Sequence, residues 1–121
     1  MAQKILIIED DKFLAQLLKK KLEEEKLEVV IAPNGEIGLK NAPETNLIIL
    51  DLLLPEMDGF EVLKKLKENE NTKKIPVLIL SNLGQREEIK QGLELGAVDY
   101  LVKANFTPRE IIEKIKLLLK S

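Results

Sequence analysis

The sequence predicts an α/β fold in which a parallel sheet lies between two layers of helices. Short aliphatic runs alternate along the chain with segments of helical period. The runs are apolar on both faces, which is typical of parallel strands that helices cover on both sides. The length of 121 residues suits one ordinary domain with a genuine core. We therefore expect a single three-layer domain over residues 1–121.

Five aliphatic runs are the expected strands. They are KILII (4–8), LEVVIA (27–32), NLIIL (46–50), IPVLIL (75–80) and AVDYLV (97–102). A longer segment follows each run, so each strand returns to the sheet through a crossover, as parallel pairing requires.

Amphipathic helices are expected between the strands and after the last one. Apolar residues recur at spacings of three and four in the segments 13–22, 60–66 and 111–119. The last helix, over 108–120, has the clearest start, because TPRE at 107–110 matches a capping box with Thr107 as N-cap and Glu110 reaching back. Asp11 is the expected N-cap of the first helix.

Composition excludes several classes of protein. The net charge is −2 and basic residues alternate with acidic ones, so no face is expected to bind nucleic acid directly. The chain has no Cys and no His, so a metal would have to be held by oxygen atoms. No signal peptide and no apolar run of about 20 residues is present, so we expect a cytoplasmic protein without a membrane segment.

Polar residues follow four of the expected strands. The first strand ends in Glu9, Asp10 and Asp11, the third in Asp51, the fourth in Ser81 and Asn82, and the fifth near Lys103. Ligands of doubly wound sheets bind beyond the carboxyl ends of the strands, so these residues form one candidate site. Several carboxylates close together repel one another, and Mg²⁺ with oxygen ligands relieves the repulsion when phosphate is the other partner.

This combination favours phosphoryl transfer to an aspartate. Mg²⁺ and Lys103 would neutralise an incoming phosphoryl group, and Ser81 would offer it a hydrogen bond. Asp51 would then act as a carboxylate nucleophile and become an aspartyl phosphate.

The same residues carry a resemblance to a known family. The motifs are IIEDD (7–11), LIILDLLLPEMDG (47–59), VLILSN (77–82) and GAVDYLVKA (96–104). Together they resemble a response-regulator receiver domain of two-component signalling, over essentially the whole chain and most like the stand-alone chemotaxis regulators. The resemblance implies a flavodoxin-like sheet of five parallel strands in the order 2-1-3-4-5 with five helices.

The resemblance also implies a role for each site residue. Asp51 is the phosphoacceptor, and Ser81 and Lys103 bind the phosphoryl oxygens. Mg²⁺, or Mn²⁺ in its place, is held by Asp10, by Asp51 and by the backbone carbonyl of Leu53, while Glu9 acts indirectly through water. Ser81 and Tyr100 form the switch that reports the phosphorylated state.

The implied function is a signalling switch, and the chain is not expected to be a turnover enzyme. A histidine kinase or a histidine phosphotransfer protein donates the phosphoryl group. The face formed by the fourth helix, fifth strand and fifth helix then changes its binding to a downstream protein target. A monomer, or a weak dimer through that face, is expected. Because the chain ends directly after the last helix, it either acts on a separate partner or is an excised fragment.

Four positions depart from the family pattern without removing a chemical group. Glu9 replaces the more usual Asp, and the second helix is short. Asn82 stands where a small Ala is common and could narrow the path of a phosphodonor. Ala104 follows Lys103 where proline is usual, and since a non-proline cis bond costs about 2.5 to 4 kcal/mol, a trans bond is favoured.

Three alternative functions can be weighed against the residues. Two are disfavoured, and the third stays open. An aspartate-nucleophile phosphatase of the haloacid dehalogenase type carries DxD, but position 53 is Leu. A flavin site needs a glycine- and hydroxyl-rich loop after the first strand, where this chain is acidic. An interaction module or an engineered scaffold that is never phosphorylated stays open, because 17 Lys against two Arg fits an idealised surface.

Two leucines predict a long-lived phosphorylated state. Leu53 and Leu83 each lie two residues beyond a site residue. In the expected fold both side chains flank the phosphoryl group on the side from which water attacks. Neither can orient a water molecule, so slow self-dephosphorylation is expected.

Overall fold

The computed structural model describes residues 2–120 and contains five parallel strands in the order β2-β1-β3-β4-β5. The strands are β1 (Lys4–Ile8), β2 (Glu28–Ala32), β3 (Leu47–Leu50), β4 (Val77–Ser81) and β5 (Asp99–Val102). The helices are α1 (Lys12–Glu24), α2 (Gly35–Asn41), α3 (Gly59–Glu68), α4 (Arg86–Glu94) and α5 (Pro108–Leu119), with a short 3₁₀ turn at Lys103–Asn105. The predicted flavodoxin-like fold and its strand order are confirmed.

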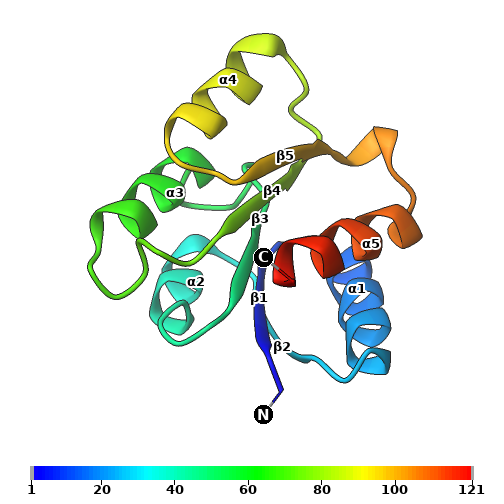
Figure 1. Ribbon diagram of the computed structural model, residues 1–121. Coiled ribbons are helices and arrows are strands. Elements are labelled where there is room, and N and C mark those ends of the chain that lie inside the picture. Colours follow the sequence, from blue (N-terminus) through cyan, green and yellow to red (C-terminus); the bar gives the residue numbers. More distant parts are fainter. Residues whose placement is uncertain (1, 121) are drawn as a thin grey trace.

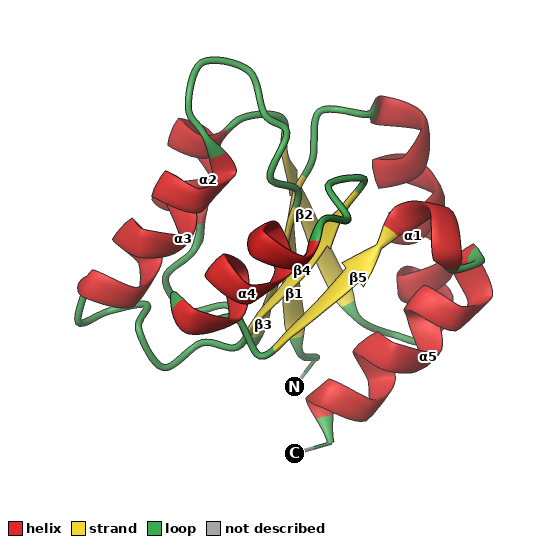
Figure 2. Cartoon of the chain, turned by 90° about the horizontal axis from the view of Figure 1, so that it is seen from above, coloured by secondary structure: helices red, strands yellow, loops and turns green. Residues whose placement is uncertain are grey.

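Two helical layers cover the sheet. Figure 1 shows α1 and α5 on one face and α2, α3 and α4 on the other, and Figure 2 shows the same separation from above. The side chains of β1 alternate accordingly, since Ile5 and Ile7 pack against α1 and α5 while Leu6 and Ile8 face the other layer. The strands are therefore buried on both faces, as their continuous apolar runs predict.

The expected caps are present at the helix starts. The Asp11 carboxylate accepts a hydrogen bond from the backbone N–H of Leu14 at 3.1 Å and caps α1. Thr107 and Glu110 form the reciprocal capping box of α5. The short α2 begins after Asn34, whose side chain accepts from the N–H of Ile37. These caps satisfy backbone N–H groups in the first turn of each helix, which fixes where the helices begin.

Four of the strands are slightly shorter than their apolar runs, whereas β1 has the same bounds as its run. β4 begins at Val77 rather than at residue 75, because Pro76 has no N–H to donate, although its carbonyl accepts from Ile48. β4 also extends one residue beyond its expected run, so the Ser81 hydroxyl belongs to the last residue of the strand. Peptide bonds between the described residues are all trans, including the bond between Lys103 and Ala104, as expected.

No helix within residues 2–120 combines the length and the apolar character needed to cross a bilayer.

Candidate functional site

The site lies where the winding of the sheet changes direction. β1 is flanked by β2 on one side and by β3 on the other, so the chain leaves the two central strands in opposite directions. Glu9 follows β1 and Asp51 follows β3. The backbone N–H of Asp51 donates to the carbonyl of Ile8 at 3.0 Å, which extends the pairing of the two strands to the site. Their carboxylates therefore meet at one edge.

The Asp51 carboxylate is buried and has a partner on each oxygen. It is only 4% exposed. Its Oδ1 accepts a hydrogen bond from the backbone N–H of Leu53 at 3.1 Å, and its Oδ2 lies 2.9 Å from the ammonium of Lys103. A carboxylate in such a place would otherwise lose solvation free energy, and these two contacts compensate for it.

Lys103 joins two acids rather than one. Its Nζ lies 2.7 Å from Oε1 of Glu9 and 2.9 Å from Oδ2 of Asp51. The other oxygen of Glu9 accepts from the backbone N–H of Asp11 at 3.0 Å. The sequence predicts that these residues share an edge, but this bridging ion pair is a finding of the structure.

Burial and neighbouring charges shift the pKa values of Glu9 and Lys103. Burial raises the pKa of Glu9 to about 7, and the charge of Asp51 adds to the rise against the opposing hydrogen bonds from Lys103 and Asp11. Burial alone would lower the pKa of Lys103, but its hydrogen bonds to Glu9 and Asp51 and their charges outweigh it and raise that pKa. Lys103 therefore keeps its positive charge beside the two carboxylates, and the pKa of Glu9 lies close to neutral pH.

Three carboxylates form a group that suits a cation. Glu9, Asp10 and Asp51 each offer an oxygen, and these atoms lie within 4.8 Å of one another. Asp10 is the exposed member, whereas Glu9 and Asp51 are buried. An all-oxygen set of this charge fits a hard divalent ion such as Mg²⁺. The backbone carbonyl of Leu53 stays a predicted ligand beside Asp10 and Asp51, and Glu9 stays a predicted indirect ligand through water.

Two hydrogen bonds through Leu83 connect the hydroxyl of Ser81 to the ring of Tyr100, the predicted switch residue. The backbone N–H of Leu83 donates to Ser81 Oγ at 3.3 Å. The carbonyl of the same residue accepts from the hydroxyl of Tyr100. Tyr100 points inward and is 8% exposed, and burial, followed by the charges of Glu88 and Asp51, raises its pKa to about 12. Residue 83 is thus a physical link between β4 and β5.

Two glycines allow close packing near the site, one at the start of α3 and one within α4, and the sequence motifs alone do not show why. A Cβ on Gly59 would come within 2.4 Å of the Leu52 Cα and 2.7 Å of the Asp51 carbonyl, so the loop after β3 folds closely onto the start of α3. A Cβ on Gly92 would come within 3.1 Å of the Tyr100 ring. Apolar periodicity does not find such contacts, because they involve no side chain on the glycine.

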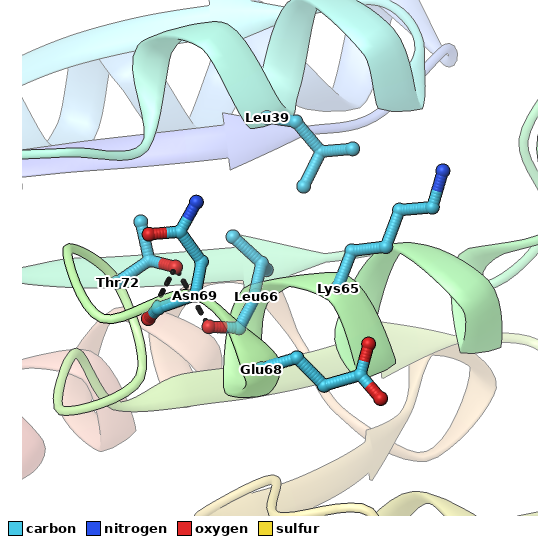
Figure 3. A pocket seen from close by; sticks show the side chains of 6 residues that line it. All are labelled: Leu39, Lys65, Leu66, Glu68, Asn69 and Thr72. Carbon is cyan, nitrogen blue, oxygen red and sulfur yellow. Dashed lines mark hydrogen bonds between the residues drawn. The ribbon is translucent and has the colours of Figure 1, made fainter.

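The pocket in Figure 3 lies away from these residues. It has a volume of about 390 Å³ and lies between the end of α2, with Leu39, and the end of α3, with Lys65, Leu66, Glu68 and Asn69. Its wall is closed by the Thr72 hydroxyl, which donates to the carbonyl of Leu66. Because α3 starts beside Asp51, its far end is at the opposite edge of the sheet, so this pocket is separate from the site.

The fold and the site together define the class of protein. It is a doubly wound α/β domain with an acidic, cation-attracting site at its switch point. The family model of the response regulator receiver domain matches residues 5–116. The chain therefore belongs to the response regulator receiver domain family.

Known proteins similar to this chain are of the same kind. The transcriptional regulatory protein SrrA of Staphylococcus aureus is 42% identical over 122 residues, which cover 99% of this chain and 49% of SrrA. The receiver domain of the Francisella response regulator 1452 has 35% identity and a TM-score of 0.86 over 98% of this chain and 97% of that one. A CheY-like receiver domain protein from Methanospirillum hungatei has 31% identity and a TM-score of 0.90 over 99% and 95% of the two chains.

Family membership establishes the general function. Receiver domains are phosphorylation-dependent switches of two-component systems, they bind Mg²⁺ at an acidic pocket, and they interact with kinases and downstream targets. The chain spans about half the length of the curated relatives it matches.

Proposed function

We propose that this domain accepts a phosphoryl group on Asp51 in a Mg²⁺-dependent reaction. The observation that carries the proposal is the position of the Asp51 carboxylate, which lies 2.9 Å from the Lys103 ammonium and within 4.8 Å of the oxygens of Glu9 and Asp10. A nucleophilic carboxylate, a fixed cation and a divalent-ion site are what phosphoryl transfer to an aspartate requires.

Each residue of the site has its own proposed role. Asp10, Asp51 and the carbonyl of Leu53 would hold Mg²⁺, or Mn²⁺ in its place, and Glu9 would act indirectly through water. The bound ion supplies charge neutralisation for the phosphoryl oxygens. Lys103 offers its ammonium and Ser81 its hydroxyl to the same oxygens.

The phosphoryl donor is another protein, a histidine kinase or a histidine phosphotransfer protein. The chain itself contains no His that could carry a phosphoryl group. The domain accepts the group and loses it slowly, so it is a switch and not a turnover enzyme.

The output surface is the face of α4, β5 and α5. Occupation of Asp51 draws the loop after β4 toward the phosphoryl group through Ser81, and the link through Leu83 passes this change to Tyr100. Leu93 in α4 and Val98, which directly precedes β5, are exposed apolar residues, which suits a downstream protein target or a weak dimer. The change is a bias between two states of one surface.

Mass spectrometry tests the assignment of Asp51 directly. With acetyl phosphate and Mg²⁺, the parent protein should gain one phosphoryl group, and Asp51→Asn should gain none. Asp58→Asn is the matched control, because Asp58 is an exposed N-cap of α3 and asparagine caps equally well. Labelling of Asp51→Asn would contradict the proposal, and an unlabelled parent would favour an interaction module that is never phosphorylated.

A further inference from the structure

We propose that the pocket between the ends of α2 and α3 binds a small aliphatic monocarboxylate. The carboxylate group accepts hydrogen bonds from Lys65 and Asn69, and the aliphatic chain lies against Leu39, all three of which line the pocket. α3 begins beside Asp51 at Gly59 and ends at this pocket. Binding here is therefore independent of the proposed role of Asp51.

One wall of the pocket is a loop that hydrogen bonds hold in a fixed shape. The Thr72 hydroxyl, whose residue is only 3% exposed, donates to the carbonyl of Leu66 at 2.7 Å. The ammonium of Lys67 donates to the carbonyls of Lys73 and Ile75 at 3.2 and 2.8 Å. The loop after α3 is thus tied to the helix at several points. The pocket needs no rearrangement to accept a ligand, as is usual for ligand sites.

Two hydrogen-bond donors face this pocket. Oδ1 of Asn69 accepts from the backbone N–H of Asn71 at 2.8 Å, which leaves the NH₂ group of Asn69 as a donor. The Lys65 ammonium has no ion-pair partner within the described part of the chain. Figure 3 shows both groups on the side of α3 that faces Leu39, with the Glu68 carboxylate turned away from it. Because Lys65 and Asn69 are four residues apart, about 6 Å along the helix axis, one carboxylate can accept from both.

The pocket also offers an apolar surface beside these donors. Leu39 is half-buried and stands across the pocket from the end of α3. The volume of about 390 Å³ lies at the small end of the range for ligand pockets, roughly 300 to 1,000 Å³. A hydrocarbon chain that covers Leu39 removes apolar surface from water, so the free energy of binding gains from the chain as well as from the carboxylate.

The charges around the pocket select a single negative charge. A helix C-terminus ordinarily disfavours an anion because of its unpaired carbonyl oxygens. Here the carbonyl of Leu66 already accepts from the Thr72 hydroxyl, and the carbonyl of Asn69 accepts from two backbone N–H groups of the loop. Lys65 balances one negative charge, and Glu68 in the lining would repel a second. A monocarboxylate therefore fits better than a dicarboxylate or a phosphate ester.

A series of ligands tests the site on the whole protein by NMR. Acetate, butyrate and hexanoate are titrated at constant ionic strength, and hexanol and hexylamine serve as controls with the same chain as hexanoate. The side-chain NH₂ signals of Asn69 and the methyl signals of Leu39 should shift together with hexanoate. Affinity should rise by up to about fourfold for each methylene group that the pocket buries. Acetate or hexylamine binding here as tightly as hexanoate would overturn the proposal.

The Asn69→Asp variant tests the donor. The new side chain keeps the oxygen that accepts from the N–H of Asn71, but it replaces the NH₂ donor with a charged oxygen. Hexanoate should bind about tenfold more weakly or less, followed by the Leu39 methyl signals. Asn71→Asp makes the same charge change at an exposed position of the same loop and should keep the parent affinity. Equal weakening in the two variants would reveal a general effect of charge and overturn the assigned site.

A second pair of variants tests the ammonium. Lys65→Gln should weaken hexanoate binding about two- to fivefold, as loss of an exposed ion pair does. Lys64→Gln is the control, because Lys64 is equally exposed on α3 but does not line this pocket. Asp51→Asn should bind hexanoate as the parent does. Unchanged affinity in Lys65→Gln, or loss of binding in Asp51→Asn, would contradict a carboxylate site at the end of α3.

Discussion

Tyr100 is the residue whose surroundings can be followed most directly, because the chain has one tyrosine and no tryptophan. Burial raises its pKa from about 10 to about 12. Its ionisation, measured by ultraviolet absorbance as the pH rises, should therefore occur well above that of a free tyrosine. A midpoint near 10 would show that the ring turns outward in solution.

The same shift predicts a pH dependence of stability. Between about pH 10 and 12 the tyrosine of the unfolded chain loses its proton while Tyr100 of the folded chain keeps it. The contribution of Tyr100 to the free energy of unfolding is thus fully present below pH 10 and is lost as the pH rises toward 12. In Tyr100→Phe, the free energy of unfolding measured with urea should not show this part of the decline with pH. Parallel plots of that free energy against pH for the two proteins would contradict the prediction.

Leu53 and Leu83 predict a slow loss of the phosphoryl group. Hydrolysis needs a water molecule in line with the breaking bond, and neither leucine can orient one. The missing hydrogen bond should raise the barrier by about 1.4 to 3 kcal/mol, or one to two powers of ten in rate. Removal of the donor followed by mass measurement should show slower loss from the parent than from a Leu53→Asn, Leu83→Glu double variant. Equal or faster loss from the parent would refute the expectation.

At the scale of elements, α3 packs closely on the loop after β3. A methyl group added at Gly59 should therefore lower the free energy of unfolding more than one added at Gly84. In Gly59→Ala the new Cβ would meet backbone atoms of Leu52 and Asp51, which cannot move aside as a side chain can. We expect a loss of about 2 to 3 kcal/mol in the free energy of unfolding, measured with urea. The Asp51 carboxylate should also be displaced, so labelling by acetyl phosphate should slow.

Gly84→Ala is the matched control for that prediction. A Cβ on Gly84 would lie 3.3 Å from a methyl group of Val102, a distance that a small side-chain adjustment relieves. The stability should therefore change little. Similar losses in the two variants would indicate that backbone freedom of the glycines, rather than the close contact at residue 59, sets the cost.

The elements differ in how far the sequence predicts them. The strands follow from their apolar runs, and α5 from its period and capping box. α4 does not follow from periodicity, because its sequence REEIKQGLE has few apolar residues and its one fully buried position is Gly92. Only the family resemblance supplied a helix there. The packing of α4 depends on the lack of a side chain at Gly92, and a pattern of apolar residues does not reveal such a position.

The candidate site was predictable in its members but not in its contacts. Strand-end positions identify Glu9, Asp51 and Lys103, because parallel strands bring their carboxyl ends to one edge. That Lys103 bridges both acids depends on separations of 2.7 and 2.9 Å between its ammonium, in the turn after β5, and the carboxylates that follow β1 and β3. Spacing along the chain does not determine such distances.

At the scale of the whole molecule, the acidic site should make folding depend on the divalent ion. A ligand that binds only the folded state adds stability, by about 2.7 kcal/mol at a hundredfold excess over its dissociation constant. Mg²⁺ should therefore raise the melting temperature of the parent and have little effect on Asp10→Ala. Calorimetry with and without a chelator measures the difference.

A control variant separates this effect from general charge. Glu24→Ala removes an exposed acid of α1 and should keep the full response to Mg²⁺. In the chelator, Asp10→Ala should be at least as stable as the parent, since one of three neighbouring negative charges is gone. Full stabilisation of Asp10→Ala by Mg²⁺ would rule out the proposed ligand set.

The double role of Leu83 has a mechanical consequence. Its N–H, bonded to Ser81, and its carbonyl, bonded to Tyr100, belong to two successive peptide planes that share one Cα atom. The second plane ends at Gly84, which tolerates the positive φ that a peptide flip creates. A half-turn of that single plane would withdraw an acceptor from the tyrosine and present a donor in its place. A change at Asp51 would then reach Tyr100 as the reversal of one peptide dipole, without any helix moving first.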